Sequence, residues 1–141
     1  MQYKRDEKYH ERERHIYALL FESNAVYIGQ TVSLSRRHKE HQSSAGSWPR
    51  SFEFKYLATV SGTKELAEDH ERAWRYVAAS NGHKIYAKPP GIVVNCRNQQ
   101  TVASRKIAKQ LQWPLAKKGG WGELIDWVIE LLKKMNLLRN C

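Results

Sequence analysis

The chain has 141 residues and a mass of 16.5 kDa, the size of one ordinary domain and too small for two independent enzyme domains. Five Trp, seven Tyr and a hydrophobic share of 41% favour a packed core over disorder. No apolar run approaches the ~20 residues of a membrane span, and the charged start of the sequence lacks the apolar segment of a secretory signal. Cys96 and Cys141, the two cysteines, are far apart, which argues against a disulfide scaffold or a cysteine zinc site. We therefore expect a cytoplasmic protein without a membrane segment.

The net charge of +10 is concentrated in one part of the sequence. Residues 81–120 hold eight basic residues and no acidic one, whereas the rest of the chain is nearly balanced. Such a stretch repels itself unless a polyanion lies alongside, and nucleic acid is the commonest such partner. The alternatives are a solvated basic face without a ligand and, less favoured because no strong apolar anchor accompanies the basic run, a phospholipid surface. The basic residues of this stretch are Lys84, Lys88, Arg97, Arg105, Lys106, Lys109, Lys117 and Lys118.

The first predicted element is a β-hairpin with the sequence HIYALLF–ESNA–VYIGQ. Small or apolar residues occupy even positions on both sides of residues 22–25, which have the composition of a turn. If the even positions of both strands share one face of the sheet, then Tyr17, Tyr27 and Gly29 all lie on the opposite face. The two tyrosines then come close across the strand pair, either directly or diagonally.

Four helices and two further strands are predicted downstream of the hairpin. Thr31 or Ser33 can cap the first of these helices, and Thr63 can cap the longest one, which Asn81-Gly82 ends. Phe52 and the alternating residues after it favour a strand. The predicted elements are a helix at 33–42, a strand at 52–60, a helix at 64–80, a short edge strand at 91–94, and helices at 101–112 and 122–136.

These elements predict an α/β fold in which helices flank a small, mainly antiparallel three-stranded sheet and a helical C-terminal extension follows. We expect residues 1–14 to form a charged N-terminal arm and residues 15–96 the main domain. Residues 97–141 are expected to form a basic helical extension that packs on this domain or continues it. An apolar stripe in the last helix follows heptad-like steps; packing on its own domain is favoured, and a homodimer interface is the alternative. The stripe consists of Leu124, Val128, Leu131, Met135 and Leu138.

The hairpin also carries the motif on which the functional prediction depends. Ile16-Tyr17 and Tyr27-Ile28-Gly29 place two tyrosines ten residues apart, and this pair resembles the signature of the GIY-YIG endonuclease family. Further residues match the family's motif at compatible spacing, so that the likeness covers residues 15–95, over half of the chain. Five ordered matches are far more specific than either tripeptide alone. The later matches are Arg37, His41, Glu71 with Trp74 three residues on, and Asn95.

One position departs from the family's pattern. His15 stands where the motif has its first glycine. Glycine allows close approach of the backbone, so the imidazole is expected either to narrow the site or to point outward.

The resemblance implies a metal-dependent DNA endonuclease that hydrolyses phosphodiester bonds in one step. It implies that the guanidinium of Arg37 binds phosphate oxygens and that Glu71 binds one Mg²⁺ or Mn²⁺, which stabilises the leaving oxygen. It also implies Tyr17 as general base. Either Arg37, His41 and the metal favour the Tyr17 phenolate, or His41 accepts the proton in concert. Spacing alone does not choose between Tyr17 and Tyr27.

Other functions stay open at this point. The chain could be a non-catalytic nucleic-acid-binding module with a vestigial nuclease site, for which His15 is the warning sign, or a nuclease that acts on RNA. Among DNA nucleases, the short tail favours a compact restriction-like, defence or mobile-element enzyme over a homing enzyme with a long linker and a separate recognition domain. We expect Arg36 and the basic residues of the tail to contact phosphates without reading bases.

Overall fold

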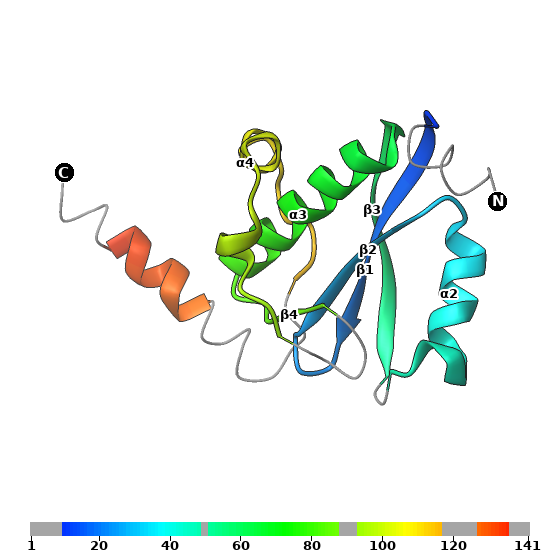
Figure 1. The fold of residues 1–141 in the computed structure, drawn as a ribbon. Helices are drawn as coiled ribbons and strands as arrows, with labels where there is room; N and C mark the ends of the chain where they lie inside the picture. Colours follow the sequence, from blue (N-terminus) through cyan, green and yellow to red (C-terminus); the bar gives the residue numbers. More distant parts are fainter. Residues whose placement is uncertain (1–9, 49–50, 88–92, 117–126, 136–141) are drawn as a thin grey trace.

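The computed structural model describes residues 10–48, 51–87, 93–116 and 127–135, which form a four-stranded sheet with helices on both of its faces (Figure 1). The strand order is β3-β1-β2-β4. β1 runs antiparallel to both of its neighbours, and β2 pairs with β4 in parallel. The predicted α/β class is confirmed, but the sheet is four-stranded and mixed instead of three-stranded. The strands are β1 (Arg12–Phe21), β2 (Val26–Thr31), β3 (Phe52–Gly62) and β4 (Ile85–Tyr86).

The fourth strand escaped prediction because it is only two residues long. Ile85 and Tyr86 pair with the first two residues of β2, and Tyr86 also bridges to Val93. Two residues cannot display an alternating pattern, so the sequence carries no periodic signal for β4. Of the edge strand expected at 91–94, residues 91 and 92 lie outside the described residues, and Val93 forms an isolated bridge.

β1 and β2 form the predicted hairpin, and alternation sorts their side chains onto two faces. Tyr17 pairs with Gly29, and Leu19 pairs with Tyr27, so paired residue numbers sum to an even number as predicted. The apolar even residues of both strands join a core with Trp74 of the long helix, whereas Tyr17 and Leu19 belong to a second cluster on the other face. The predicted placement of the two tyrosines and Gly29 on one face is confirmed.

Among the described helices, α2 flanks one side of the sheet, and α3 and α4 flank the other (Figure 1). The longest, α3, has the predicted bounds, and the side chain of its N-cap Thr63 accepts a hydrogen bond from the backbone N–H of Leu66. A capping box of Thr101 and Ser104 starts α4, which ends earlier than predicted. The helices are α2 (Leu34–Gln42), α3 (Lys64–Ser80) and α4 (Val102–Ala108).

Regular structure extends beyond residues 15–96 in both directions. β1 begins at Arg12 because β3 continues to Gly62, and these two residues are the last pair of the ladder. After α4, Leu111, Trp113 and Leu115 pack against the core between the sheet and α3. Residues 111–115 of the C-terminal extension therefore contribute apolar side chains to the core of the main domain.

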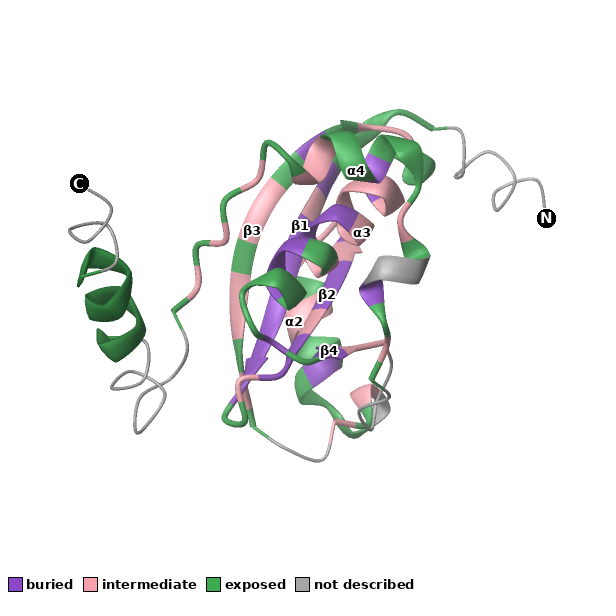
Figure 2. Cartoon of the chain, turned by 90° about the vertical axis from the view of Figure 1, so that its left-hand side faces the viewer, coloured by how far each residue is buried: buried purple, intermediate pink, exposed green. Residues whose placement is uncertain are grey.

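The last described segment, residues 127–135, is helical and exposed along its whole length (Figure 2). Three members of the predicted apolar stripe, Val128, Leu131 and Met135, are 40%, 44% and 50% exposed, so the favoured packing on their own domain is not seen for them. Leu124 and Leu138 lie outside the described residues, and the homodimer interface stays a prediction. Of the described helices, none combines the length and the apolar content needed to cross a bilayer.

Candidate active site

Tyr17 is the centre of the candidate site. Its side chain is fully buried on the α2 side of the sheet, and its ring stacks on Phe54 of β3 with ring centroids 4.8 Å apart. The Tyr17 hydroxyl lies 2.7 Å from Nε2 of His41 and accepts a hydrogen bond from Nε of Arg37 at 3.1 Å. The ring of Tyr27 lies 6.4 Å from that of Tyr17, centroid to centroid. Four of the predicted site residues therefore meet in one cluster.

Helix α2 delivers two of these residues from one face. Arg37 and His41 are separated by one helical turn, so both side chains point toward the sheet. Leu34, at the start of α2, packs into the same apolar cluster as Tyr17 and holds the helix against β1. The predicted i, i+4 relation between Arg37 and His41 is thus the geometry that α2 presents to Tyr17.

Gly29 makes room for the Tyr17 hydroxyl. The two residues are directly paired across β1 and β2. A Cβ atom at position 29 would meet the hydroxyl oxygen and would lie 2.6 Å from Cζ of the tyrosine ring. The glycine of the second tripeptide is therefore required by space, because any side chain there would displace Tyr17.

Trp48 fixes which nitrogen of His41 carries the proton. The indole Nε1 of Trp48 donates to Nδ1 of His41 at 3.0 Å, and an indole nitrogen can only donate. Nδ1 must therefore accept, and in the neutral imidazole the proton then resides on Nε2. His41 Nε2–H consequently donates to the Tyr17 hydroxyl, so the phenol oxygen receives two hydrogen bonds and His41 is not placed to accept the tyrosine proton.

Burial dominates the ionisation of the two groups in the cluster. It raises the pKa of Tyr17 above its usual value, as does Tyr27, and the hydrogen bond and charge of Arg37 only partly oppose this shift. Burial, followed by the charge of Arg37, lowers the pKa of His41 to about 4. At neutral pH His41 is therefore uncharged, and Tyr17 is a neutral phenol. His41 could stabilise a Tyr17 phenolate only through its N–H, and Arg37 is the charged group of the cluster that favours ionisation of Tyr17.

Replacing Trp48 with Phe should alter the proton position on His41 and lower the cleavage that the motif predicts by up to about tenfold, the value of one ordinary hydrogen bond. Phe keeps an aromatic ring but removes the indole donor, so Nδ1 of His41 is free to carry the proton. ¹⁵N chemical shifts of the His41 ring report the tautomer, and a cleavage assay reports the rate. An unchanged Nε2–H tautomer together with an unchanged rate would show that Trp48 does not position His41.

Arg37 is shared between Tyr17 and a residue that the sequence did not single out. Its Nη1 donates to Oε2 of Glu40 at 2.8 Å. Burial would lower the pKa of Arg37, but the hydrogen bonds with Tyr17 and Glu40 outweigh this effect and raise the pKa above its usual value. The guanidinium is therefore charged. Its contacts within the described residues use two of the five N–H groups, and the side chain is 37% exposed. The guanidinium can therefore bind an anion from solvent.

Glu71 reaches the same region from α3, on the other side of the sheet. Within the described residues, β4 pairs with only the first two residues of β2, so Gly29 and Gln30 lie beyond its end. Glu71 accepts a hydrogen bond from the Gln30 side chain. The negative charge of Glu71 contributes to raising the pKa of Tyr17. Glu71 and Tyr17 are therefore close enough to interact electrostatically at this edge of the sheet.

The surroundings of Glu71 fit a site for one divalent cation. Glu71 forms an ion pair with Arg75, yet burial still raises the pKa of the carboxyl group. The described residues contain no group of three or more His, Cys, Asp or Glu that could hold a metal, but Mg²⁺ bound through one carboxylate and a substrate phosphate needs none. The carboxylate opens on a cavity of about 410 Å³ lined by Gln30, Lys64, Glu68, Glu71, Arg72 and Arg75.

Two predicted residues lie away from the cluster. Asn95 is exposed and follows Val93, which is bridged to the outer side of β4, so two strands separate it from β1. His15 points toward β3, where its Nδ1 lies 2.8 Å from Oγ1 of Thr59. His15 therefore lies on the same face of the sheet as Tyr17 but contacts β3 instead of the Tyr17 hydroxyl.

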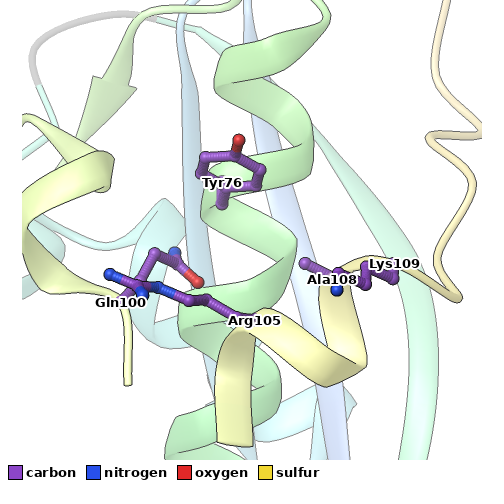
Figure 3. Close-up of a pocket in the computed structure, with 5 residues that line it drawn as sticks. All are labelled: Tyr76, Gln100, Arg105, Ala108 and Lys109. Carbon is purple, nitrogen blue, oxygen red and sulfur yellow. The ribbon is translucent and has the colours of Figure 1, made fainter. Parts of the chain in front are cut away.

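The basic residues predicted to contact nucleic acid divide between the two sides of the sheet. Arg36 lies on α2 with its side chain 66% exposed and pairs with Glu40. The α4 residues lie across the sheet, where Tyr76, Gln100, Arg105, Ala108 and Lys109 line a pocket between α3 and α4 (Figure 3). Lys84, Arg105, Lys106 and Lys109 are exposed. Lys88, Lys117, Lys118 and the side chain of Arg97 lie outside the described residues.

Sequence reasoning missed several residues that support the site. Glu40 could have been noticed from its i, i+3 relation to Arg37, and Arg75 from its i, i+4 relation to Glu71. Trp48 and Phe54 gave no such signal, because their contacts with His41 and Tyr17 join separate elements.

Comparison of the chain with protein-family models, with curated proteins and with solved structures finds no match in any of the three. The functional argument therefore depends on the motif and on the geometry of these side chains.

Proposed function

We propose that the chain is a metal-dependent DNA endonuclease of the GIY-YIG type. The observation that carries this proposal is the hydrogen-bonded junction of Arg37 and His41 on the Tyr17 hydroxyl. Arg37 and His41 match the motif and lie 20 and 24 residues beyond Tyr17 along the chain. Glu71, a fourth match from another helix, is close enough to influence the pKa of Tyr17.

In the proposed reaction, Arg37 binds oxygens of the scissile phosphate through N–H groups that Tyr17 and Glu40 leave available. Tyr17, as phenolate, accepts a proton from a water molecule whose oxygen forms a bond to phosphorus. The bond from phosphorus to the 3′ oxygen breaks, and this oxygen leaves with the electron pair and takes a proton from solvent. The N–H groups of Arg37 and His41 stabilise the phenolate. Glu71 would hold one Mg²⁺ or Mn²⁺, which when bound supplies positive charge to the leaving oxygen.

A second function, a nucleic-acid-binding module without cleavage, is favoured by two specific observations. The side chain of Tyr17 is fully buried, and Arg75 already neutralises Glu71. Both features would be expected of a site that has lost catalysis. The basic residues of α2 and α4 would serve such a module equally well.

Incubation with supercoiled plasmid should give nicked or linear DNA in Mg²⁺ or Mn²⁺ and none in EDTA. Replacing Glu71 with Gln should reduce this cleavage by about 100-fold or more, because the amide cannot supply a carboxylate ligand. Glu65→Gln, which changes an exposed carboxylate in the first turn of the same helix, is the matched control and should cleave normally.

The same assay separates the alternatives when labelled single- and double-stranded DNA and RNA are offered in parallel. Cleavage confined to RNA would move the proposal to an RNA-directed nuclease. No metal-dependent cleavage of any substrate, combined with retained binding, would favour the binding module. Sequencing of the ends cut from random DNA would then test the restriction-like, defence or mobile-element role.

A further inference from the structure

β3 contains a β-bulge next to the candidate site. Ile16 pairs with Ala58, but the next residue of β1, Tyr17, pairs with Tyr56, so Leu57 is an extra residue in β3. Leu57 and Ala58 are consecutive, yet both pack against the core on the α3 side. Bulges of this kind reorient side chains and occur often beside active sites.

The bulge places two residues on the α2 face that regular alternation would separate. Tyr56 and Thr59 are three positions apart, so without the extra residue their side chains would point to opposite faces. In the structure the Tyr56 hydroxyl lies 2.7 Å from Oγ1 of Thr59, and the same oxygen lies 2.8 Å from Nδ1 of His15. The result is a hydrogen-bonded group of three residues on the face that carries Tyr17.

The ring of Tyr56 is both exposed and held in place. Tyr56 is 55% exposed. Its ring meets the ring of His15 edge-on, with centroids 6.4 Å apart and an angle of 60° between the planes, and its hydroxyl is tied to Thr59. An aromatic ring whose orientation is fixed without being buried provides a preformed flat surface for a ligand.

The register sets this surface beside the candidate site. Tyr56 is the direct partner of Tyr17 across β1 and β3, and side chains directly opposite in an antiparallel pair have Cβ atoms about 4.5–5.5 Å apart. A nucleic acid strand whose phosphate lies at the Tyr17 hydroxyl would therefore have a neighbouring nucleotide within reach of the Tyr56 ring.

We infer that Tyr56, supported by Thr59 and His15, is a stacking site for a nucleobase that flanks the scissile phosphate. The inference rests on the proposed function and specifies its substrate class. Stacking on a protein ring requires a base whose face is free, as in single strands, loops and bulges, and the faces of bases inside a duplex are covered by their neighbours. The occupant is thus an unpaired base, and the net charge of +10 favours the polyanionic strand that carries it.

Binding of a labelled oligonucleotide in EDTA tests the inference without requiring cleavage. Fluorescence anisotropy with single-stranded DNA should show affinity about 5- to 100-fold lower for Tyr56→Ala than for the wild type, the range expected for loss of one stacked base. Tyr56→Phe keeps the ring, so its loss of affinity should be less than half of the loss seen with Tyr56→Ala. Affinity for a blunt duplex of the same sequence should change less than twofold.

Two variants make the result interpretable. Trp127→Ala removes an aromatic ring of 63% exposure from the helical segment 127–135, outside the candidate site, and should leave affinity for single strands unchanged. Tyr56→Thr removes the ring but retains a residue that suits a strand, and should reproduce the loss seen with Tyr56→Ala while the circular dichroism spectrum stays that of the wild type.

Unchanged affinity for single strands in both Tyr56→Ala and Tyr56→Thr would overturn the stacking site. Equal losses for single strands and duplex would overturn the preference for an unpaired base. These measurements are made without metal, so their outcome is independent of the plasmid assay. If the protein binds as expected but does not cleave, the stacking site is supported and the endonuclease proposal is overturned.

Discussion

Replacing Tyr17 with Phe is expected to lower DNA cleavage by about 10²–10⁴-fold, the usual contribution of a general base. Phe keeps the ring that stacks on Phe54 and removes only the hydroxyl that receives hydrogen bonds from Arg37 and His41. Stability should fall by about 1–3 kcal/mol because the buried N–H of His41 loses its acceptor. Single-turnover cleavage and urea unfolding measure the two effects separately.

Tyr27→Phe is the matched control, since it removes the other motif hydroxyl. It should retain more activity than Tyr17→Phe if Tyr17 is the base. Because burial raises the pKa of Tyr17, the phenolate is scarce at neutral pH, and wild-type cleavage should increase with pH from about 6 to about 9. Wild-type activity in Tyr17→Phe, or a rate that does not change over this pH range, would remove the Tyr17 hydroxyl from the mechanism.

Replacing Gly29 with Ala is expected to be as damaging as removing a catalytic group, with cleavage reduced about 100-fold or more. The added methyl would meet the Tyr17 hydroxyl and ring. The ring cannot move away cheaply, because it is fully buried between Phe54 and His41. Overpacking of this kind costs about 1–3 kcal/mol, so the free energy of unfolding should also decrease.

A double-mutant cycle with Tyr17→Phe tests the physical cause. The Tyr17→Phe change removes the atom nearest to the added methyl, so the loss of stability in the double variant should be smaller than the sum of the two single losses. Additive losses in stability, or normal cleavage by Gly29→Ala, would show that the glycine is not needed for the position of Tyr17.

Local patterns predicted most of the fold. The alternation in β1 and β2 predicted the two faces of the hairpin and an even sum for paired residue numbers, but not which residues pair. The cap at Thr63 and the stop at Asn81-Gly82 predicted both ends of α3. The two-residue β4 had no local signal, because its pairing depends on how the chain returns to β2 after α3. The bulge at Leu57 was also hidden, since FEFKYLATV alternates well enough to suggest a regular strand.

The members of the candidate site were predicted in part, and its electrostatics were not predicted. The resemblance to the GIY-YIG motif selected Tyr17, Arg37 and His41, and the structure joins these three by hydrogen bonds. Sequence gave no measure of burial, which raises the pKa of Tyr17 and leaves His41 neutral. The proton position on His41 depends on Trp48, which lies beyond the end of α2 and reaches the imidazole only in the folded chain.

The short length of β4 determines how the two charged groups of the site are held relative to each other. Arg37 belongs to a helix on one side of the sheet and Glu71 to a helix on the other, and each contacts a different strand: Arg37 donates to Tyr17 of β1, and Glu71 accepts from Gln30 of β2. Both contacts lie beyond the end of β4, at the rim formed by Gly29 and Gln30, where regular pairing of β1 with β2 holds the backbone in place. Larger side chains at Gly29 or Gln30 should therefore shift the guanidinium of Arg37 relative to the carboxylate of Glu71, even when each helix keeps its own packing.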